Sequence, residues 1–336
     1  MSLKLSVLDQ SPIHDSKDEK DGLFDTIKLA QHCEKLGYHR YLLAEHHDTP
    51  GYASCAPEVM IGAVANATSK IRVGSGGVML NHYNSLKVAE VFNTLNALYD
   101  NRIDLGIGRA SGASFMAARA LHTNNSDYFQ KAFELINYLD DTTPKESKYS
   151  EISLSPKGNH STPVYLLGSS DKSASLAGFL GAGFILALFI GTHEKNARII
   201  EEYKNSFKQS QNFRQAKAII AIACIVAESK EEAEYIASSH TFWKVQAFRH
   251  PKRDEIQSPK LVKELYENLS YEDKQYYKDT LETMVLGTAK ECKKQIENLA
   301  KEYQVEEVII VNVTYSFEHR KKSYELLAKE FNLINN

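Results

Sequence analysis

Two segments far apart in the chain are apolar over most of their length. They read AIIAIACIVA in residues 218–227 and VEEVIIVNV in residues 305–313. A strand with one face in water alternates apolar and polar residues, whereas a continuous apolar run is buried on both faces, as in parallel sheets covered by helices. The two segments therefore predict a parallel sheet that is enclosed by helices.

Six further segments have a strand-like composition, and segments of helical periodicity separate them. The predicted strands are Leu3–Leu8, Tyr38–Ala44, Ile71–Leu80, Arg102–Gly108, Val164–Gly168, Phe184–Ile190, Ala218–Ala227 and Val305–Val313. Eight strands, each followed by a helix and spaced over the full length, favour a single α/β domain over residues 1–336, a (β/α)₈ TIM barrel. A doubly wound open sheet is the alternative.

Two longer segments interrupt this alternation. Residues 142–163 follow the fourth predicted helix (Asp127–Asp140) and are polar, so they predict a small insertion, for which a hairpin is the simplest structure. Residues 244–285 lie between the seventh and eighth strands and are charged and rich in tyrosine. Insertions of this length in compact folds are usually functional, so we expect residues 244–285 to be a mobile lid; a rigid insertion is the alternative. The tyrosines expected to fold over a ligand are Tyr266, Tyr271, Tyr276 and Tyr277.

Composition and charge exclude several classes of protein. A formal net charge of -3, with both signs interspersed, gives no basis for binding nucleic acid or an anionic membrane. The longest apolar stretch, Gly178–Ile190, is too short to span a bilayer, and the N-terminus lacks a signal-peptide pattern. We expect a cytoplasmic protein. Its cysteines, which lack the spacing of a zinc site and are expected to be reduced, are Cys33, Cys55, Cys224 and Cys292.

The second predicted strand is followed by Glu45, His46 and His47, which suit a metal site, a catalytic base or a solvated turn. Successive side chains of a strand point to opposite faces. The two histidines therefore cannot easily bind one metal ion, and no metal site is predicted. A histidine at the carboxyl end of a barrel strand fits proton transfer, because its ordinary pKa lies near neutrality. A hydrogen-bonded structural histidine is the alternative.

Glycines lie within the third predicted strand and at the end of the fourth. Gly76 and Gly77 belong to the sequence GSGG, and Gly108 belongs to GIGRASG. The second sequence resembles a dinucleotide fingerprint only superficially, because no strong helical pattern starts directly after it. Glycines remove side chains from the barrel mouth, so a flat aromatic ring could lie against the backbone. Tight packing of the barrel is the alternative.

A charged and hydroxyl-rich group follows the fourth and fifth strands. Arg109 ends the fourth strand, and the sequence LLGSSDKSAS ends the fifth and opens a helix with Ser169, Ser170 and Ser173. A helix N-terminus and an arginine one strand away make an anion site. These residues predict a phosphate site, and together with the glycines they suggest a phosphorylated aromatic cofactor. An N-cap beside an unrelated surface arginine is the alternative.

Residues 37–112, 164–183 and 305–328 resemble the bacterial luciferase-like monooxygenases in the expected order. The resemblance implies a (β/α)₈ barrel, usually dimeric, that binds FMN or, in some branches, the deazaflavin F420. It implies that His46 is the active-site histidine and that a cis peptide joins Gly76 to Gly77 beneath the ring. Gly108 stands where bacterial luciferases have a reactive cysteine. The residues that the resemblance implies for the FMN phosphate are Arg109, Ser169, Ser170 and Ser173.

We therefore expect an enzyme, an FMN-dependent monooxygenase that uses O₂ and in which His46 transfers protons. Because the chain lacks an NAD(P)H fingerprint, we expect a separate flavin reductase to supply reduced FMN. His47 is expected in a surface turn, and Glu45 is expected to contact the site residues and not the ligand. Leu188 and Phe189 replace the polar or aromatic groups of relatives, which leaves the substrate open. An F420-dependent oxidoreductase and a non-catalytic flavin-binding protein are the alternatives.

Overall fold

The computed structural model describes residues 3–121, 127–156, 158–191, 196–250 and 254–335. Within these residues, parallel strands close into a (β/α)₈ barrel, because the last strand pairs with both the first strand and β8. The closure confirms the predicted barrel and rules out the open sheet. In barrel order the strands are β1 (Lys4–Asp9), β2 (Arg40–Leu43), β3 (Arg72–Ser75), β5 (Ile103–Gly108), β6 (Val164–Gly168), β7 (Gly183–Ala187), β8 (Ala218–Val226) and β10 (Glu307–Val311).

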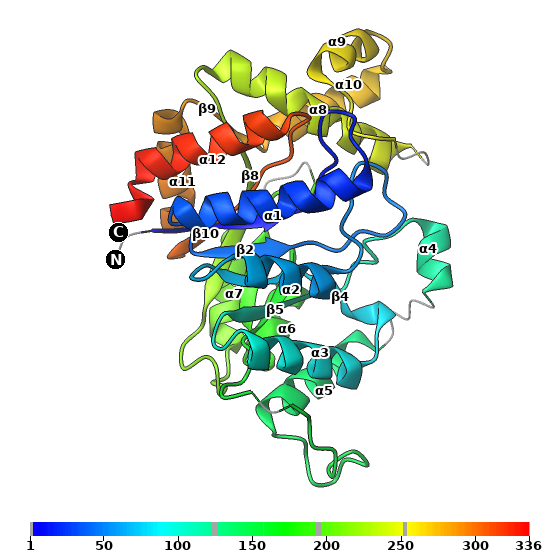
Figure 1. Ribbon diagram of the computed structural model, residues 1–336, viewed down its shortest axis with the longest axis vertical. Helices are drawn as coiled ribbons and strands as arrows, with labels where there is room; N and C mark the ends of the chain where they lie inside the picture. Colours follow the sequence, from blue (N-terminus) through cyan, green and yellow to red (C-terminus); the bar gives the residue numbers. More distant parts are fainter. Residues whose placement is uncertain (1–2, 122–126, 157, 192–195, 251–253, 336) are drawn as a thin grey trace.

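Helices surround the barrel, and Figure 1 shows α12, α1, α2 and α3 in sequence across its near face. In the first helix, Asp18 caps the N-terminus, and the chain leaves the helix through Gly37, whose φ is +86°. The helices are α1 (Glu19–Lys35), α2 (Pro57–Ala67), α3 (Ser85–Leu98), α4 (Phe115–Ala120), α5 (Tyr128–Asp140), α6 (Asp171–Phe179), α7 (Arg198–Ser206), α8 (Lys230–Arg249), α9 (Pro259–Glu267), α10 (Tyr271–Glu282), α11 (Ala289–Glu302) and α12 (Phe317–Phe331), with the 3₁₀ turns η1 (Leu80–His82) and η2 (Leu333–Asn335).

Three strand predictions need correction. The predicted strand Ile71–Leu80 is broken into β3 and β4 (Val78–Met79) by the cis peptide between Gly76 and Gly77, which confirms the expected position of that bond. The predicted strand Phe184–Ile190 ends earlier, at Ala187, because the Leu188 N–H turns back to the Leu186 carbonyl. A short strand, β9 (Val285–Gly287), pairs with β8 and was not predicted.

The polar insertion after α5 is not a hairpin. Its described residues, 142–156 and 158–163, form turns and irregular structure without a strand. Pro144 begins a turn, and the Ser155–Pro156 peptide is cis. The hairpin prediction was wrong, because the described residues of this insertion form no pair of strands.

The barrel interior is polar at the amino ends of the strands and apolar above. Arg40 contacts Glu307 through Nε and Nη2, at 2.5 and 3.1 Å, and contacts Asp104 through Nη1, at 2.8 Å. Burial opposes charge on Glu307, but Arg40 outweighs it and holds the pKa of that carboxyl below its usual range. Above this layer lies an apolar cluster that includes Leu8, Leu42, Ala44, Tyr165, Ile185, Ile219, Ala221, Ile309 and Val311. The floor beneath the mouth is therefore a closed, packed core.

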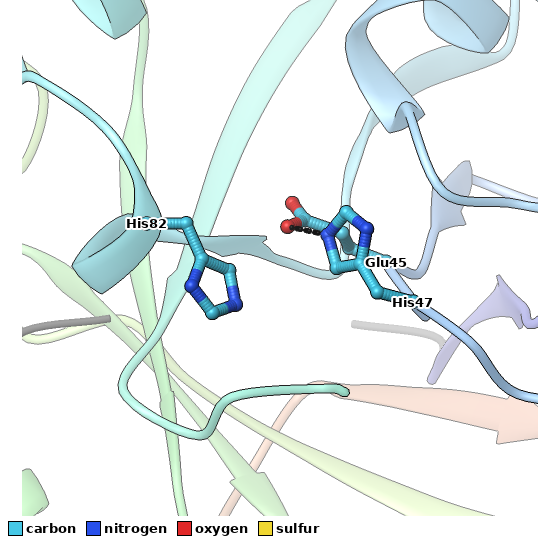
Figure 2. Close-up of side chains that lie close together, drawn as sticks. All are labelled: Glu45, His47 and His82. Carbon is cyan, nitrogen blue, oxygen red and sulfur yellow. Dashed lines mark hydrogen bonds and ion pairs between the residues drawn. The ribbon is translucent and has the colours of Figure 1, made fainter. Parts of the chain in front are cut away.

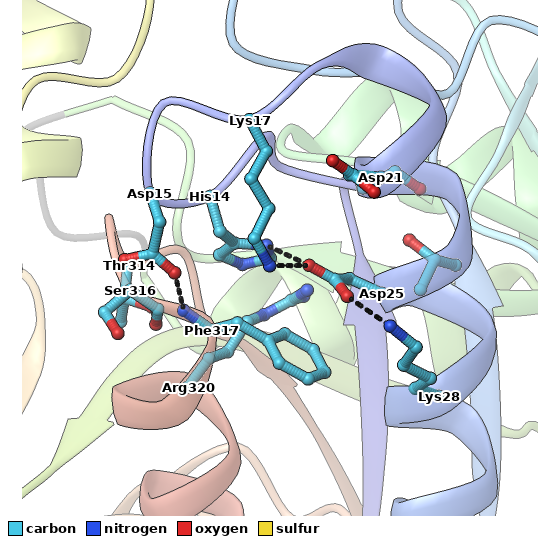
Figure 3. Close-up of polar contacts among 12 residues, drawn as sticks. His14, Asp15, Lys17, Asp21, Asp25, Lys28, Thr314, Ser316, Phe317 and Arg320 are labelled. Atoms are coloured by element: carbon cyan, nitrogen blue, oxygen red, sulfur yellow. Dashed lines mark hydrogen bonds and ion pairs between the residues drawn. The ribbon is translucent and has the colours of Figure 1, made fainter.

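A second buried ionic group joins α12 to β1; Figure 3 shows its Arg320 together with His14 and Asp25. Arg320 donates to Asp9 through Nη2 at 2.6 Å, and Tyr41 also donates to Asp9. Burial opposes charge on Asp9, but Arg320 lowers the pKa of that carboxyl overall. His14 lies beside this pair, 3.7 Å from Asp25, and burial lowers its pKa to about 3. The uncharged ring therefore belongs to the folded structure at neutral pH.

The predicted lid begins inside a helix. Lys244 lies within α8, which is continuous to Arg249, so the expected start of the insertion is too early. Helices α9 and α10 group beside α8 in Figure 1 and pack against it through a shared apolar cluster. That cluster includes Phe242, Val245, Val262, Tyr266, Tyr276 and Tyr277. Of the four tyrosines, Tyr271 is the most exposed, at 79%. The other three, Tyr266, Tyr276 and Tyr277, pack in this cluster.

Candidate active site

His46 lies where β2 ends, at the mouth of the barrel. Its Nδ1 is 3.0 Å from the main-chain oxygen of Glu45, and its Nε2 is 3.4 Å from the amide nitrogen of Gln10. A carbonyl oxygen can only accept, so Nδ1 carries the hydrogen and Nε2 of the neutral ring keeps its lone pair. The Tyr52 ring packs edge-on against the imidazole at 4.8 Å. This arrangement fixes the tautomer in which Nε2 can accept a proton.

The glycines of the mouth are required by close packing. A Cβ on Gly76 would lie 2.4 Å from Leu8 Cδ1, and one on Gly77 would lie 2.7 Å from the Gly106 carbonyl oxygen. A Cβ on Gly108 would instead meet the flexible end of Met79, at 3.2 Å. Packing therefore explains Gly76 and Gly77 without a ligand. The same packing keeps the backbone bare beside Ala44, so a flat ring also fits this wall.

The predicted phosphate residues leave neighbouring strands at the same end of the barrel. The pairing of Ile107 with Leu166 places Arg109 beside the point where the chain leaves β6. Both Arg109 and Ser169 are exposed. Ser170 and Ser173 form the capping box of α6: the Ser173 N–H donates to Ser170 Oγ, and the Ser170 N–H donates to Ser173 Oγ at 3.1 Å. Both serines therefore cap the helix, and their contact with a phosphate stays a prediction; the exposed helix N-terminus is suited to an anion.

Helix α8 closes one side of the mouth. We did not predict this wall from the sequence. The Tyr52 hydroxyl is 3.1 Å from His240 Nε2, and Trp243 Nε1 donates to the Pro50 carbonyl at 3.1 Å. Lys244 Nζ donates to the Phe189 carbonyl at 2.8 Å, beyond the end of β7. Burial holds the pKa of His240 well below its usual range, and Lys244 lowers it further. The one sequence signal was the single tryptophan of the chain, within an otherwise ordinary helix.

Glu45 is the centre of a hydrogen-bonded group on the other side of the strand end (Figure 2). Its side chain is fully buried and accepts from His47 Nε2 at 2.8 Å, Tyr83 Oη at 2.9 Å and the Met79 N–H at 3.1 Å. The Met79 N–H lies two residues beyond the Gly76–Gly77 peptide. Through this hydrogen bond Glu45 supports the wall of the mouth, as expected. His47 is not in a surface turn, since its side chain is only 15% exposed and faces Glu45. His82 completes the group, with its ring 5.5 Å from that of His47.

A closed parallel barrel whose polar side chains gather at the carboxyl ends of its strands has the architecture of the TIM-barrel enzymes. Residues 2–305 match the family described as luciferase-like monooxygenase. The chain belongs to this family.

Relatives match over nearly the whole chain. A protein of Bacillus subtilis, the uncharacterized YwcH, is 35% identical over 333 residues, which cover 98% of this chain and 99% of that protein. The N-acetyl-S-alkylcysteine monooxygenase of the same organism is 33% identical over 331 residues, 97% of each chain. Monooxygenases of this family are therefore similar to the chain along its full length.

Solved structures show the same fold. Apo-MsnO8 is 30% identical and has a TM-score of 0.85, with 99% of this chain and 98% of that chain covered. The FMN complex of the oxygenating constituent of 3,6-diketocamphane monooxygenase, from Pseudomonas putida, has a TM-score of 0.70 at 14% identity and covers 98% of each chain. An F420-dependent secondary alcohol dehydrogenase has a TM-score of 0.69 at 17% identity, with both chains fully covered. One fold thus carries both cofactors, and fold alone does not choose between them.

Across the described residues, no helix is both long enough and apolar enough to cross a membrane. The four cysteines are free thiols, three of them buried, with Cys55 exposed.

Proposed function

We propose that the protein is a flavin-dependent monooxygenase that uses reduced FMN and O₂ to oxidise a small organic substrate. The observation that carries this proposal is the orientation of His46, whose Nδ1 donates to the Glu45 carbonyl and whose Nε2 faces Gln10 at the mouth of the barrel. Monooxygenation needs protons delivered and removed at defined atoms, and a positioned imidazole is suited to that task. One oxygen atom would enter the substrate, and the other would leave as water.

The residues of the mouth fit FMN. The bare wall at Gly76, Gly77 and Gly108 suits the flat ring, and Arg109 with the N-terminus of α6 suits the phosphate. When bound, reduced FMN supplies the two electrons that oxygen activation requires. The chain contributes orientation, the exclusion of water by the α8 wall and proton transfer by His46. An F420-dependent oxidoreductase and a non-catalytic flavin-binding protein remain the alternatives, and the fold similarity to an F420-dependent dehydrogenase favours testing the first of them.

Three further proposals concern the setting of the enzyme. Four free thiols support a reducing cytoplasm. Because we found no NAD(P)H fingerprint in the sequence, we propose that a separate flavin reductase supplies reduced FMN. The family expectation supports a homodimer.

The similarity to an N-acetyl-S-alkylcysteine monooxygenase makes thioethers the first substrates to test.

Replacing Arg109 by alanine tests FMN binding. We expect the affinity for FMN to fall by about tenfold or more, since a hydrogen bond to a charged group contributes about 1.5–3 kcal/mol. Riboflavin, which lacks the phosphate, should lose much less. Fluorescence titration of both ligands measures the two losses, and Arg119→Ala in α4 is the matched control. Equal losses for FMN and riboflavin would show that Arg109 does not contact the phosphate.

We propose that α9 and α10, with the end of α8, move as the lid. Arg249 Nε is 2.5 Å and His250 Nε2 is 3.0 Å from Asp273, so this carboxylate ties the end of α8 to α10. Asp273 is buried, but Arg249 and His250 are exposed, and ion pairs that reach the solvent contribute up to about 1 kcal/mol, so Asp273→Ala should speed tryptic cleavage near Lys260 by about two- to fivefold. The other expected cleavage sites, Lys252 and Arg253, lie outside the described residues.

Reduced FMN with substrate should slow that cleavage in the unmodified protein. Timed digestion followed by mass spectrometry identifies the sites and their rates. If residues 244–285 resist trypsin as well as the barrel does, with and without ligand, the segment is a rigid insertion.

A further inference from the structure

Three side chains with metal-binding chemistry converge beside the mouth, on the face of β2 opposite to His46. Figure 2 shows Glu45 and His47, which follow β2, facing His82 of η1. One ligand atom from each lies within 4.8 Å of the other two. Glu45 is buried, and both histidines are partly buried. The group therefore has a fixed base and an open side.

The hydrogen bonds in this group orient the rings. His82 Nε2 is 2.6 Å from the Ser111 carbonyl oxygen, which can only accept, so this nitrogen carries the hydrogen. The lone pair of neutral His82 is then on Nδ1. Histidines that bind metals commonly donate their other ring N–H to a carbonyl or a carboxylate, which holds the ring in place. Ser111 stands in that relation to His82.

The charge of the group also favours a cation. Among the described residues, no Lys or Arg lies within ion-pair distance of the buried Glu45 carboxylate, which accepts hydrogen bonds from His47, Tyr83 and the Met79 N–H. A buried carboxylate requires a compensating positive charge or several hydrogen bonds. A divalent cation between Glu45 and the imidazoles would supply such a positive charge.

We propose that Glu45, His47 and His82 form a binding site for a divalent transition metal ion of the zinc class. Two imidazoles and one carboxylate suit Zn²⁺, Co²⁺ or Ni²⁺ and not Mg²⁺ or Ca²⁺, which prefer oxygen ligands. Ligand atoms about 2.1 Å from a tetrahedral ion are about 3.4 Å apart. Side-chain rotation must therefore bring the outermost atoms closer by roughly 1.4 Å. The site uses His47 and leaves His46 on the opposite face, so it is independent of the proposed flavin chemistry.

Calorimetric titration of the flavin-free full chain with ZnCl₂ tests the proposal. The affinity tag is removed, the protein is treated with chelator, and Cys55→Ser is used as the background because that thiol is exposed. We expect one equivalent of Zn²⁺ per chain. His82→Asn should weaken binding by at least about 100-fold, because even outer partners of metal ligands contribute 10- to 100-fold. CoCl₂ provides a second readout, since a site with imidazole ligands changes the visible absorption of Co²⁺.

Two controls complete the experiment. His160→Asn removes an exposed histidine at the amino end of the barrel and should leave binding unchanged. His47→Asn should behave like His82→Asn, so the test does not depend on the buried Glu45, whose replacement can impair folding. Saturable binding of equal strength in wild type and His82→Asn overturns the proposal. So does the absence of saturable binding in the wild type, which would leave the group as a hydrogen-bonded support. Neither result bears on FMN.

Discussion

Replacing His46 by asparagine should lower turnover by about 10²–10⁴-fold, the usual effect of removing a general acid–base group. Asparagine retains a polar group near Gln10 but has no ring nitrogen that titrates near neutrality. The His46 ring is only partly buried and packs edge-on against Tyr52, so the melting temperature and the FMN affinity should stay close to wild type. Steady-state turnover, thermal unfolding and flavin titration measure the three quantities.

The matched control is His319→Asn, which changes an exposed histidine of α12. Its turnover and stability should both equal those of wild type. A His46→Asn protein that unfolds, or one that turns over normally, would show that His46 is a structural histidine.

Replacing Arg40 by methionine should lower the free energy of unfolding by about 3–5 kcal/mol, the usual cost of removing one partner of a buried ion pair. The change leaves Glu307 and Asp104 in the barrel interior without the guanidinium that contacts both. Arg72 still pairs with Asp104 at 2.6 Å, which limits the loss. Urea unfolding followed by circular dichroism measures the change.

Two further variants check that charge is the cause. Arg72→Met should cost less, because the Arg72 side chain is 21% exposed against 3% for Arg40. Adding Glu307→Gln to Arg40→Met should restore part of the lost stability, because it removes an uncompensated buried charge. A loss below about 1 kcal/mol for Arg40→Met would contradict the importance of this pair. FMN affinity should not change, since Arg40 lies at the opposite end of the barrel.

The barrel could be predicted because burial on both faces leaves a local signal. The runs that became β8 and β10 are apolar over most of their length, and their observed bounds lie within two residues of the predicted ones. The cis peptide between Gly76 and Gly77 was expected from the family resemblance, whereas the break that it marks in the strand Ile71–Leu80 was not. The end of β7 was not, because Leu188 and Phe189 are as apolar as the strand, and only the turn at Leu188 ends it.

Much of the site could not be predicted because it depends on residues distant in sequence. Tyr83 reaches Glu45 across 38 positions, and His240 reaches Tyr52 across 188. Neither pair leaves a periodic signal. His46 and Arg109 were identifiable because each follows a strand directly, so the position on the chain already gives the position on the barrel. His47 was misjudged because a tertiary contact with Glu45, not its place in a turn, buries it.

The most direct test of the central proposal is the fate of molecular oxygen during turnover. Reduced FMN would be supplied by a separate flavin reductase under ¹⁸O₂, with a substrate panel that begins with N-acetyl-S-alkylcysteines, and the products would be analysed by mass spectrometry. The proposed monooxygenase reaction predicts one ¹⁸O atom in the product and none when F420 replaces FMN. Product that forms only with F420 and carries no ¹⁸O would contradict the proposal.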